Sequence, residues 1–363
     1  MNGSNAAKRV LALVSLVAMV AVADAGAAYG RSVDEIANLT GPDRQNILIQ
    51  GAKAEGTLLW YTTLIVNQAA RPIKAAFEKK YPFIKLEFIR ANSSKLVARL
   101  LAENRSKSYR ADIVIASAAP VLKKAGLAQP FRTPEAAIYP KDYTDPDRSW
   151  QTIRVSYNGI GYNTKLVSAA EAPKTFEDLL DPKWKGKMVW GKSSETGAPL
   201  FITHIRMVMG EKKGMAYLKK LAKQDIVTVA GSIRSVLDRV IAGEHAVMVS
   251  AALHHVAISA AKGAPIASTS PEPVIGRNGY VMIMKTAPHP YAAMLFIDYI
   301  VSEEGQNILR KARYLPAHPK VDPLPKMQMI VPSFTGLKEN LIGPDQLEKE
   351  RKTSVSIYRK LFK

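Results

Sequence analysis

Residues 56–63 carry the sequence Gly-Thr-Leu-Leu-Trp-Tyr-Thr-Thr, a nearly continuous apolar run that ends in two hydroxyl side chains. Such a run is typical of a strand that is buried on both faces of a parallel sheet. A helical pattern follows between Asn67 and Lys80, in which Pro72 is tolerable only in the first turn, and Pro82 ends it. The segment therefore predicts a strand followed by a crossover helix.

The same order of strand and helix recurs downstream. Residues 84–89 and 111–116 have the character of a second and a third strand, and Leu96, Leu100 and Leu101 form a helical stripe between them. Parallel strands that are joined by single helices send the loops after the strands to one edge of the sheet. We expect a ligand cleft at that edge.

A second α/β series begins near Ile153, after a proline-rich stretch at residues 129–150 that we interpret as a crossing between two lobes. Its predicted strands are residues 186–190, 226–230 and 246–250, and its predicted helices are residues 201–209, 214–221, 232–242 and an alanine-rich segment that ends at Lys262. Pro271, Pro273 and Gly276 mark a crossing back, before a strand at 280–284 and a helix at 292–309. The last 18 residues predict a terminal helix that docks on the second lobe.

This organisation predicts an α/β protein of two lobes, with the ligand cleft between them. The first lobe is expected to comprise residues 33–135 and 277–320, and the second residues 136–276 and 321–363. About 335 residues remain after an expected signal peptide at residues 1–25, which exceeds the roughly 250–300 residues at which single cores stop growing, so two cores are expected.

The N-terminus reads as a secretory signal peptide, predicted at residues 1–25. Lys8 and Arg9 precede an apolar stretch from Val10 to Ala23, and small residues follow. The stretch is shorter than the roughly 20 residues of a membrane-spanning helix. The chain has no cysteine, which excludes disulfides, thiolate metal sites and a lipid-carrying cysteine. We expect a periplasmic protein without a lipid anchor.

The formal net charge is +20, but the Lys and Arg residues are dispersed along the chain and do not gather in runs. A dispersed basic surface does not predict a nucleic-acid partner. It is compatible with a solvated surface or with anionic solutes.

Four segments resemble the type II periplasmic solute-binding proteins of ABC importers, in particular the branch of ferric-ion, phosphonate and polyamine binders. They are residues 111–115 (ADIVI), 157–163 (YNGIGYN), 176–187 (FEDLLDPKWKGK), and 287–293 (APHPYAA) continuing to 302–306 (SEEGQ). The resemblance implies two lobes, each a mostly parallel sheet flanked by helices, that close on a solute by a hinge. It also implies an ABC permease as the partner, and we expect a monomer.

Tyrosine-ligated ferric binders of this family carry a Tyr-Tyr pair before an alanine-rich helix, whereas the matching residues 243–255 contain no tyrosine. Ferric iron prefers oxygen ligands, so ferric binding is not expected. His254 and His255 stand at this point, but adjacent helical residues diverge by about 100° and rarely share one metal. A divalent metal site at His254 and His255 stays an alternative, and His254 is the predicted ligand-facing histidine.

Polar side chains follow the predicted strands and make up the predicted ligand site. From the first lobe these are Thr62, Thr63, Asn92, Ser93 and Ser117. From the second lobe they are Ser194, Glu195, Thr196, Ser232 and Arg234, and the set is completed by His254, Tyr157 and Tyr280. The N-terminus of a helix with free backbone N–H groups binds anions, although the same residues also serve as ordinary helix caps. We expect a small anionic solute.

The sequence contains no nucleophile elbow and no phosphate-binding loop. We therefore expect no catalytic residues, no cofactor and no resident metal. Two alternatives stay open beside the importer component: an exported two-lobed enzyme that uses His254 or His255 as an acid–base group, and a ligand sensor without transport.

Overall fold

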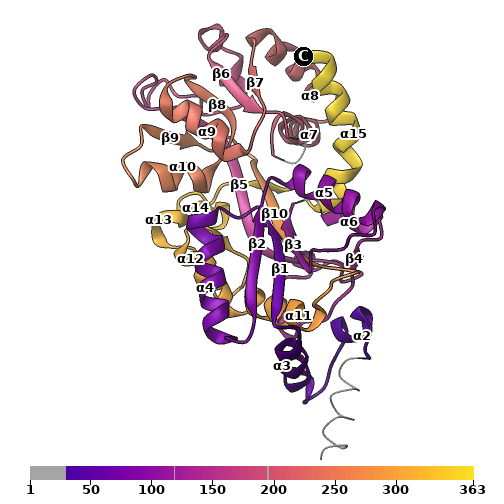
Figure 1. Cartoon of the computed structure of the whole chain (residues 1–363). Coiled ribbons are helices and arrows are strands. Elements are labelled where there is room, and N and C mark those ends of the chain that lie inside the picture. The colour runs from indigo at the N-terminus through magenta and orange to yellow at the C-terminus, as the bar shows by residue number, and fades with distance from the viewer. Residues whose placement is uncertain (1–29, 118, 194–195) are drawn as a thin grey trace, which may run out of the picture.

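The computed structural model describes residues 30–117, 119–193 and 196–363, which form two lobes joined by long strands (Figure 1). The predicted signal peptide lies outside the described residues. The two lobes share one sheet with the strand order β2-β1-β3-β10-β5-β8-β6-β7. Within the part of the chain that is described, no helix is both long and apolar enough to cross a membrane.

The first lobe is built on the strand–helix repeat that begins at residue 57. Its strands are β1 (Thr57–Thr62), β2 (Lys85–Arg90) and β3 (Ile113–Ala116), and its connecting helices are η1 (Val66–Ala70), α4 (Arg71–Lys80), α5 (Ser93–Arg105) and α6 (Ala119–Lys124). The three strands are parallel, with β1 in the middle. Pro72 stands in the first turn of α4. The predicted strands and crossover helix are confirmed.

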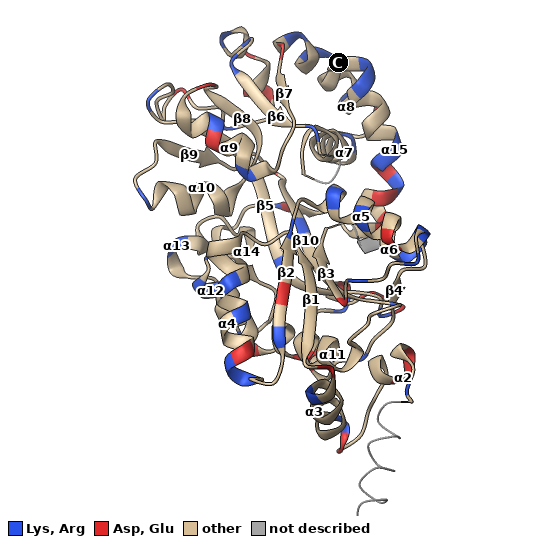
Figure 2. Cartoon of the chain, viewed as in Figure 1, with Lys and Arg blue, Asp and Glu red and all other residues tan. Residues whose placement is uncertain are grey.

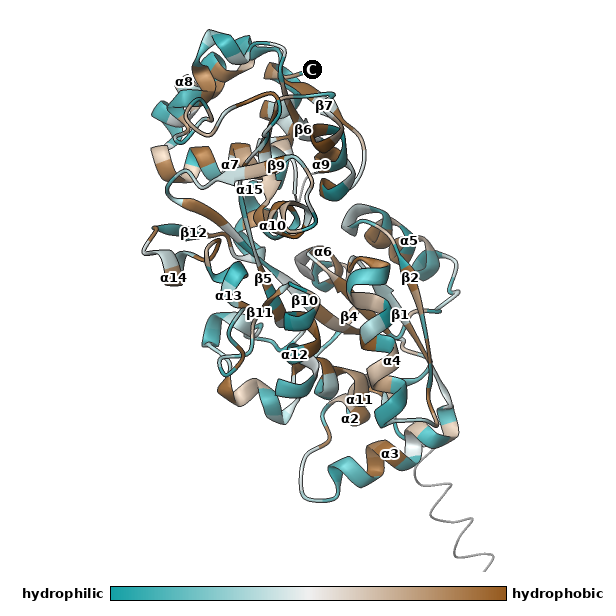
Figure 3. Ribbon diagram, turned by 90° about the vertical axis from the view of Figure 1, so that its left-hand side faces the viewer, coloured by the Kyte–Doolittle hydropathy of each residue, from teal (hydrophilic) through white to brown (hydrophobic). Residues whose placement is uncertain are grey.

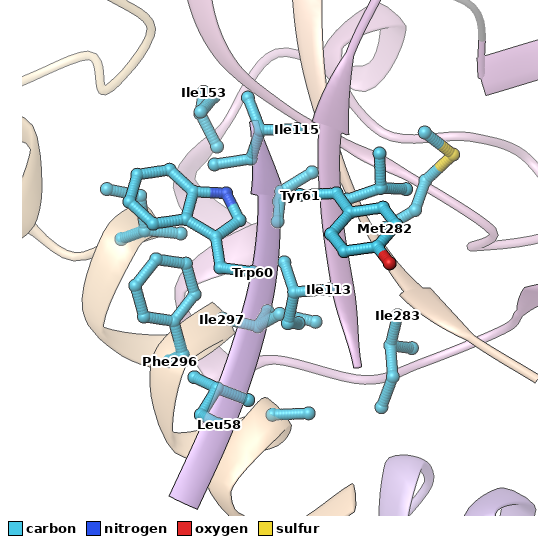
Figure 4. Close-up of a cluster of buried hydrophobic side chains, with 14 of the residues drawn as sticks. Leu58, Trp60, Tyr61, Ile113, Ile115, Ile153, Met282, Ile283, Phe296 and Ile297 are labelled. Atoms are coloured by element: carbon cyan, nitrogen blue, oxygen red, sulfur yellow. The ribbon is translucent and has the colours of Figure 1, made fainter. Parts of the chain in front are cut away.

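Aromatic packing closes the core of the first lobe (Figure 4). The ring of Trp60 on β1 lies 5.1 Å from that of Phe296 on α11 (Pro290–Val301). Helix α3 (Arg44–Glu55) packs on α11 at Gly51, where a Cβ atom would lie 2.3 Å from the ring of Tyr291. Helix α3 was not predicted from the sequence, because its apolar residues do not form one stripe along the helix.

The second lobe repeats the arrangement. Its parallel strands are β6 (Met188–Gly191), β7 (Val227–Val229) and β8 (Val247–Ala252), and its helices are α7 (Ala198–Met209), α8 (Glu211–Leu221), α9 (Ile233–Ala242), α10 (Leu253–Ala260) and α15 (Pro344–Leu361). Helix α15 packs on α7, and the ring of Phe362 lies 4.8 Å from that of Trp190. The predicted docking of the terminal helix on the second lobe is confirmed.

Two antiparallel strands cross between the lobes, β5 (Gln151–Asn163) and β10 (Val274–Met284) (Figure 3). The first crossing lies later in the chain than residues 129–150, where it was predicted. Phe131, Tyr139 and Trp150 of that stretch are buried in the core of the first lobe, so the stretch belongs to one lobe and does not span two. Strand β5 is buried along its whole length and gave no alternating pattern.

The predicted single helix at 292–309 is wrong, because the structure has two helices, α11 and α12 (Glu303–Lys311). Ser302 between them has an extended backbone, and its Oγ accepts a hydrogen bond from the N–H of Gly305 at 3.3 Å. Ser302 is therefore a helix cap that starts a new helix.

Short elements complete the chain. They are α2 (Val33–Ala37), β4 (Ala128–Gln129), β9 (Ile266–Thr269), β11 (Leu315–Pro316), α13 (Pro325–Gln328), α14 (Pro332–Thr335), β12 (Glu339–Leu341) and 3-10 turns at Pro134–Ile138, Lys141–Tyr143, Glu177–Leu180, Pro182–Trp184 and Ala222–Gln224.

Asp112 holds the first lobe together where three segments meet. Its carboxylate is fully buried, and Oδ2 accepts a hydrogen bond from the N–H of Leu59 at 2.8 Å. Oδ1 accepts one from the N–H of His289 at 2.7 Å, and Oδ2 lies 3.0 Å from Nδ1 of His289. This hydrogen bond raises the pKa of His289 above its usual value. Asp112 thus joins β1 to the start of α11.

Replacing Asp112 by Ala should lower the free energy of unfolding by about 2–5 kcal/mol, because two backbone N–H groups lose their partner. Urea denaturation at pH 7 measures this change. Asp147→Ala is the control, because that side chain is 71% exposed and forms a surface ion pair with Lys123. Equal stability of the two variants would contradict the role of Asp112.

Candidate functional site

A cavity of about 70 Å³ lies between the lobes, at the carboxyl ends of the parallel strands. The first lobe contributes Thr63, Ile65, Arg90, Asn92, Ser93 and Ser117; the second contributes Ser193, Thr196, Gly231, Ser232, Ile233, Arg234, His254 and His255; the crossing strands and the turn before β11 contribute Arg154, Arg277 and Tyr314. We call it the arginine cavity, after Arg90, Arg154, Arg234 and Arg277. No Asp or Glu is among its described lining residues.

Arg154 lies on the crossing strand β5 and is only 6% exposed. Its Nη1 donates a hydrogen bond to Oγ of Ser156 at 2.6 Å, and its guanidinium lies 5.4 Å from the centre of the Tyr314 ring. Gly279 on β10 makes room for this side chain, because a Cβ atom there would lie 2.9 Å from Nε of Arg154. Burial lowers the pKa of Arg154 below its usual value. Keeping Arg154 charged inside the protein therefore costs solvation free energy.

Arg277 on β10 is also buried, and its Nη1 donates to Oγ of Ser117 at 3.1 Å. Arg90 ends β2, and its Nε is buried without a hydrogen-bond partner among the described residues, as is Nε of Arg154. The Nε–H groups of Arg90 and Arg154 can therefore donate hydrogen bonds to a ligand.

Arg234 on α9 is held differently from the other three arginines. Its Nη1 donates to Oγ of Ser259 at 2.7 Å, and its Nη2 donates to Asp238 at 2.6 Å. Its side chain is 31% exposed. A paired and partly solvated arginine has less to gain from an anion than a buried one.

Both histidines of the first turn of α10 line the cavity. Their ring centres are 4.2 Å apart, and each Nδ1 is buried without a hydrogen-bond partner in the described part of the chain. Burial, followed by the charges of Arg234 and the other arginines, lowers the pKa of His255 to about 3. Burial likewise lowers the pKa of His254 well below its usual value, and His255 adds to this effect. At neutral pH both rings are uncharged, and each offers one donor and one acceptor.

Helix caps and hydroxyls form the polar rim of the cavity. Asn92 caps α5 by accepting a hydrogen bond from the N–H of Lys95 at 2.9 Å, and Ser232 caps α9 by accepting one from Ser235 at 3.1 Å. Asn92 and Ser232 are therefore helix caps, and both also line the cavity. The backbone ends of two helices are therefore directed to the same space as the arginines.

Eight residues of the predicted ligand site line the arginine cavity: Thr63, Asn92, Ser93, Ser117, Thr196, Ser232, Arg234 and His254. Ser194 and Glu195 lie outside the described residues. Thr62, Tyr157 and Tyr280 are not among the lining residues.

The three residues that lie elsewhere have packing or hydrogen-bonding roles. Oγ1 of Thr62 accepts from the N–H of Leu64 at 3.1 Å. Tyr157 lies in a small apolar core beside the crossing strands. Side chains alternate between the two faces of a strand, so Tyr157, three positions after Arg154 on β5, points to the opposite face. The ring of Tyr280 packs at a tilt against that of Trp150 inside the first lobe, with the ring centres 4.5 Å apart.

Arg90, Arg154, Arg277 and Tyr314 were not predicted from the sequence, and His255 was named only as a metal ligand or acid–base group, not as part of the ligand site. One signal was present for two of them: Arg154 and Arg277 each interrupt an otherwise apolar or neutral stretch that the structure shows as a buried strand. A charged residue in a fully buried strand is rare unless it is paired or functional. The side-by-side rings of His254 and His255 differ from the expectation that only one of two adjacent helical residues would face the site.

Among the described residues, no group of three or more His, Cys, Asp or Glu side chains is placed to hold a metal ion. His254 and His255 bring only two imidazoles, with four arginines around them.

Comparison with known proteins agrees with this architecture. A sequence profile of the family described as bacterial extracellular solute-binding protein matches residues 110–332. Iron uptake protein A1 of Synechocystis sp. is 25% identical over 288 residues, which cover 73% of this chain and 76% of that protein.

Two solved structures share the fold. The periplasmic binding protein AfuA from Actinobacillus pleuropneumoniae, with fructose-6-phosphate bound, has a TM-score of 0.72 at 24% identity, over 85% of this chain and 99% of that one. Iron-bound HitA from Pseudomonas aeruginosa has a TM-score of 0.69 at 19% identity, over 84% and 99%. The resemblance that the four sequence segments indicated is confirmed. Since the matched residues make up more than half of the chain, the protein belongs to the bacterial extracellular solute-binding protein family.

Proposed function

We propose that the protein is the periplasmic solute-binding component of an ABC importer and that it holds a small anion in the arginine cavity. The observation that carries this proposal is the set of four arginines around one interlobe cavity, with no described carboxylate among its lining residues. The protein would act as a monomer and deliver its solute to an ABC permease.

Electrostatics supports an anion over other solutes. Moving a charged group out of water costs several kcal/mol, and only an opposite charge with good hydrogen-bond geometry offsets that cost. Arg154 is buried, and no carboxylate of the described residues forms an ion pair with it. An oxyanion would accept charge-assisted hydrogen bonds from several guanidinium groups at once.

The size of the cavity favours a small head group. Its volume of about 70 Å³ is well below the roughly 300–1,000 Å³ of pockets that enclose drug-sized ligands. A phosphate, phosphonate or carboxylate group fits this description. We favour a phosphorus oxyanion, because its three oxygens and up to two negative charges match four arginines better than a carboxylate does. That AfuA was solved with fructose-6-phosphate is in line with this choice.

The same charges oppose the binding of a metal cation. Two related proteins carry iron in their names or in their structures, but their chemistry does not transfer to this cavity. Residues 243–255 contain no tyrosine, and a cation at His254 and His255 would face four arginines. Like charges within one low-dielectric cavity repel each other strongly.

Replacing Arg154 by Met should weaken the binding of inorganic phosphate and of fructose 6-phosphate by about 10- to 150-fold, since a charge-assisted hydrogen bond contributes about 1.5–3 kcal/mol. The unliganded variant should be at least as stable as the wild type, because it no longer buries a cation. Calorimetric titration measures the first effect and urea denaturation the second.

The control for this experiment is Arg239→Met, because that arginine is half exposed on the surface of α9 and pairs with Glu244. It should leave affinity unchanged. If Arg154→Met bound every tested anion as tightly as the wild type does, the arginine cavity would not be the ligand site.

The stability of the unliganded protein should fall when the pH drops below about 6.5. The unfolded chain takes up a proton at His255 near pH 6.5, whereas the folded chain does so only near its lowered pKa of about 3. The unfolded state therefore binds more protons between these values, and the free energy of unfolding decreases by up to about 1.4 kcal/mol per pH unit for one such histidine.

His255→Gln should remove this contribution. Denaturation at pH 7 and pH 5, in the absence of anions other than chloride, should show a smaller loss for this variant than for the wild type. His245→Gln is the comparison, because the His245 ring is only partly buried and burial lowers its pKa less than that of His255, so this variant should keep most of the loss. Equal losses in the wild type and in His255→Gln would mean that His255 is charged in the folded protein.

A further inference from the structure

A second cavity, of about 420 Å³, adjoins the arginine cavity, and the two share Ile65 and Arg234 as lining residues. We call it the outer cavity. Its walls come from both lobes: η1 and the turn after α12 on one side, and α9 with the end of α10 on the other. In Figure 1, α10 forms the lower edge of the second lobe, above α12.

Cations line the outer cavity. Beside Arg234 these are Lys262, Lys311 and Arg313, and no Asp or Glu is among the described lining residues. No ion pair joins these three side chains to a described carboxylate, whereas Arg234 pairs with Asp238. Lys and Arg are spread over both lobes (Figure 2), so basic residues alone would not mark a site. Their convergence on one cavity that shares Ile65 and Arg234 with another cationic cavity is the informative feature.

Helix termini provide an alternative explanation for some of these cations. Lys311 and Arg313 lie at the C-terminal end of α12, and Lys262 lies just after α10, where a positive charge complements the helix dipole. Each dipole contributes only about half a negative charge. Asp238 offsets the charge of Arg234, and two helix ends do not neutralise the three positive charges of Lys262, Lys311 and Arg313, so the outer cavity keeps an excess positive charge.

The walls of the outer cavity are tied by hydrogen bonds. Nε2 of Gln68 donates to the carbonyl oxygen of Ala312 at 2.8 Å, which joins η1 to the turn that carries Lys311 and Arg313. Nη1 of Arg234 donates to Ser259, which also lines the cavity. These bonds hold the backbone of the turn and the side chain of Arg234 in place, which reduces the entropy that these groups lose on binding.

We propose that the outer cavity is a second anion subsite and that the ligand carries two acidic groups, one for each cavity, joined by a short neutral spacer. This inference rests on the proposed function of the arginine cavity. Arg234 lies at the junction and would contact both ends of such a ligand. Because each cavity has walls from both lobes, a ligand of this kind would link the lobes twice.

The test compares alkanediol bisphosphates of increasing length with the monophosphates of the same diols, by calorimetric titration of the full-length mature protein. We expect at least one bisphosphate to bind about tenfold or more tightly than its monophosphate. This is the gain in affinity that at least one additional charge-assisted hydrogen bond would give. In Lys262→Met/Lys311→Met the ratio of the two affinities should fall to near one. Lys349→Met, on the exposed surface of α15, is the matched control and should keep the ratio.

Raised ionic strength separates a subsite from simple steering, because steering acts on the association rate and is screened by salt. If the outer cavity is a subsite, the bisphosphate should still dissociate more slowly than the monophosphate at about 0.5 M salt, where the screening length is only a few ångström. Phosphate binding without any bisphosphate preference would overturn the second subsite alone. If no phosphate compound bound at all, the choice of a phosphorus oxyanion as the ligand would fail, and the second subsite with it.

Discussion

The antiparallel pairing of β5 with β10 is the constraint on which both lobes and the site depend. Strand β10 pairs with β3 of the first lobe, and β5 pairs with β8 of the second, so the two sheets are continuous through this one pair. Ser156 faces Arg277 across the pair, and Arg154 faces Gly279. Two of the four arginines are therefore fixed at the axis between the lobes. A hinge motion would move groups that are carried on helices, such as Arg234, more than these two.

Placing cations at this axis works against the stability of the chain. Arg154 is buried beside an aromatic ring and a serine hydroxyl, neither of which neutralises its charge. The neutral state of His254 and His255 limits the cost, because two further charges in the same cavity would add repulsion. The apolar core of each lobe supplies the stability that the site does not. Well-packed surroundings around unsatisfied polar groups are typical of binding sites, because the ligand completes the hydrogen bonds.

Local rules account for what the sequence predicted well. The buried strand at 57–62 follows from an apolar run, and the caps Asn92 and Ser232 follow from short polar residues before helices. Of the arginines, only Arg234 could be identified in this way, because it stands beside a predicted helix cap. Arg154 and Arg277 each interrupt a neutral stretch, but only the pairing of distant strands brings these two residues together. The first crossing was misplaced for a related reason. The prolines at 129–150 break periodicity, but burial of Phe131 and Trp150 in the first lobe depends on contacts distant in sequence.

The two cavities would contribute differently to the recognition of the proposed ligand. If the arginine cavity holds an anion as proposed, its buried donors would give selectivity, because an anion that left one of them unsatisfied would bind less tightly. In the outer cavity, Lys262 and Lys311 are exposed and flexible, and they add attraction with little geometric selection. A ligand joined through a spacer meets the second set at high effective concentration once its first group is bound. Since both cavities take walls from both lobes, the proposed second contact would exist only when the lobes are closed. Its free energy would then favour the closed state alone, which is the condition for a ligand to drive closure.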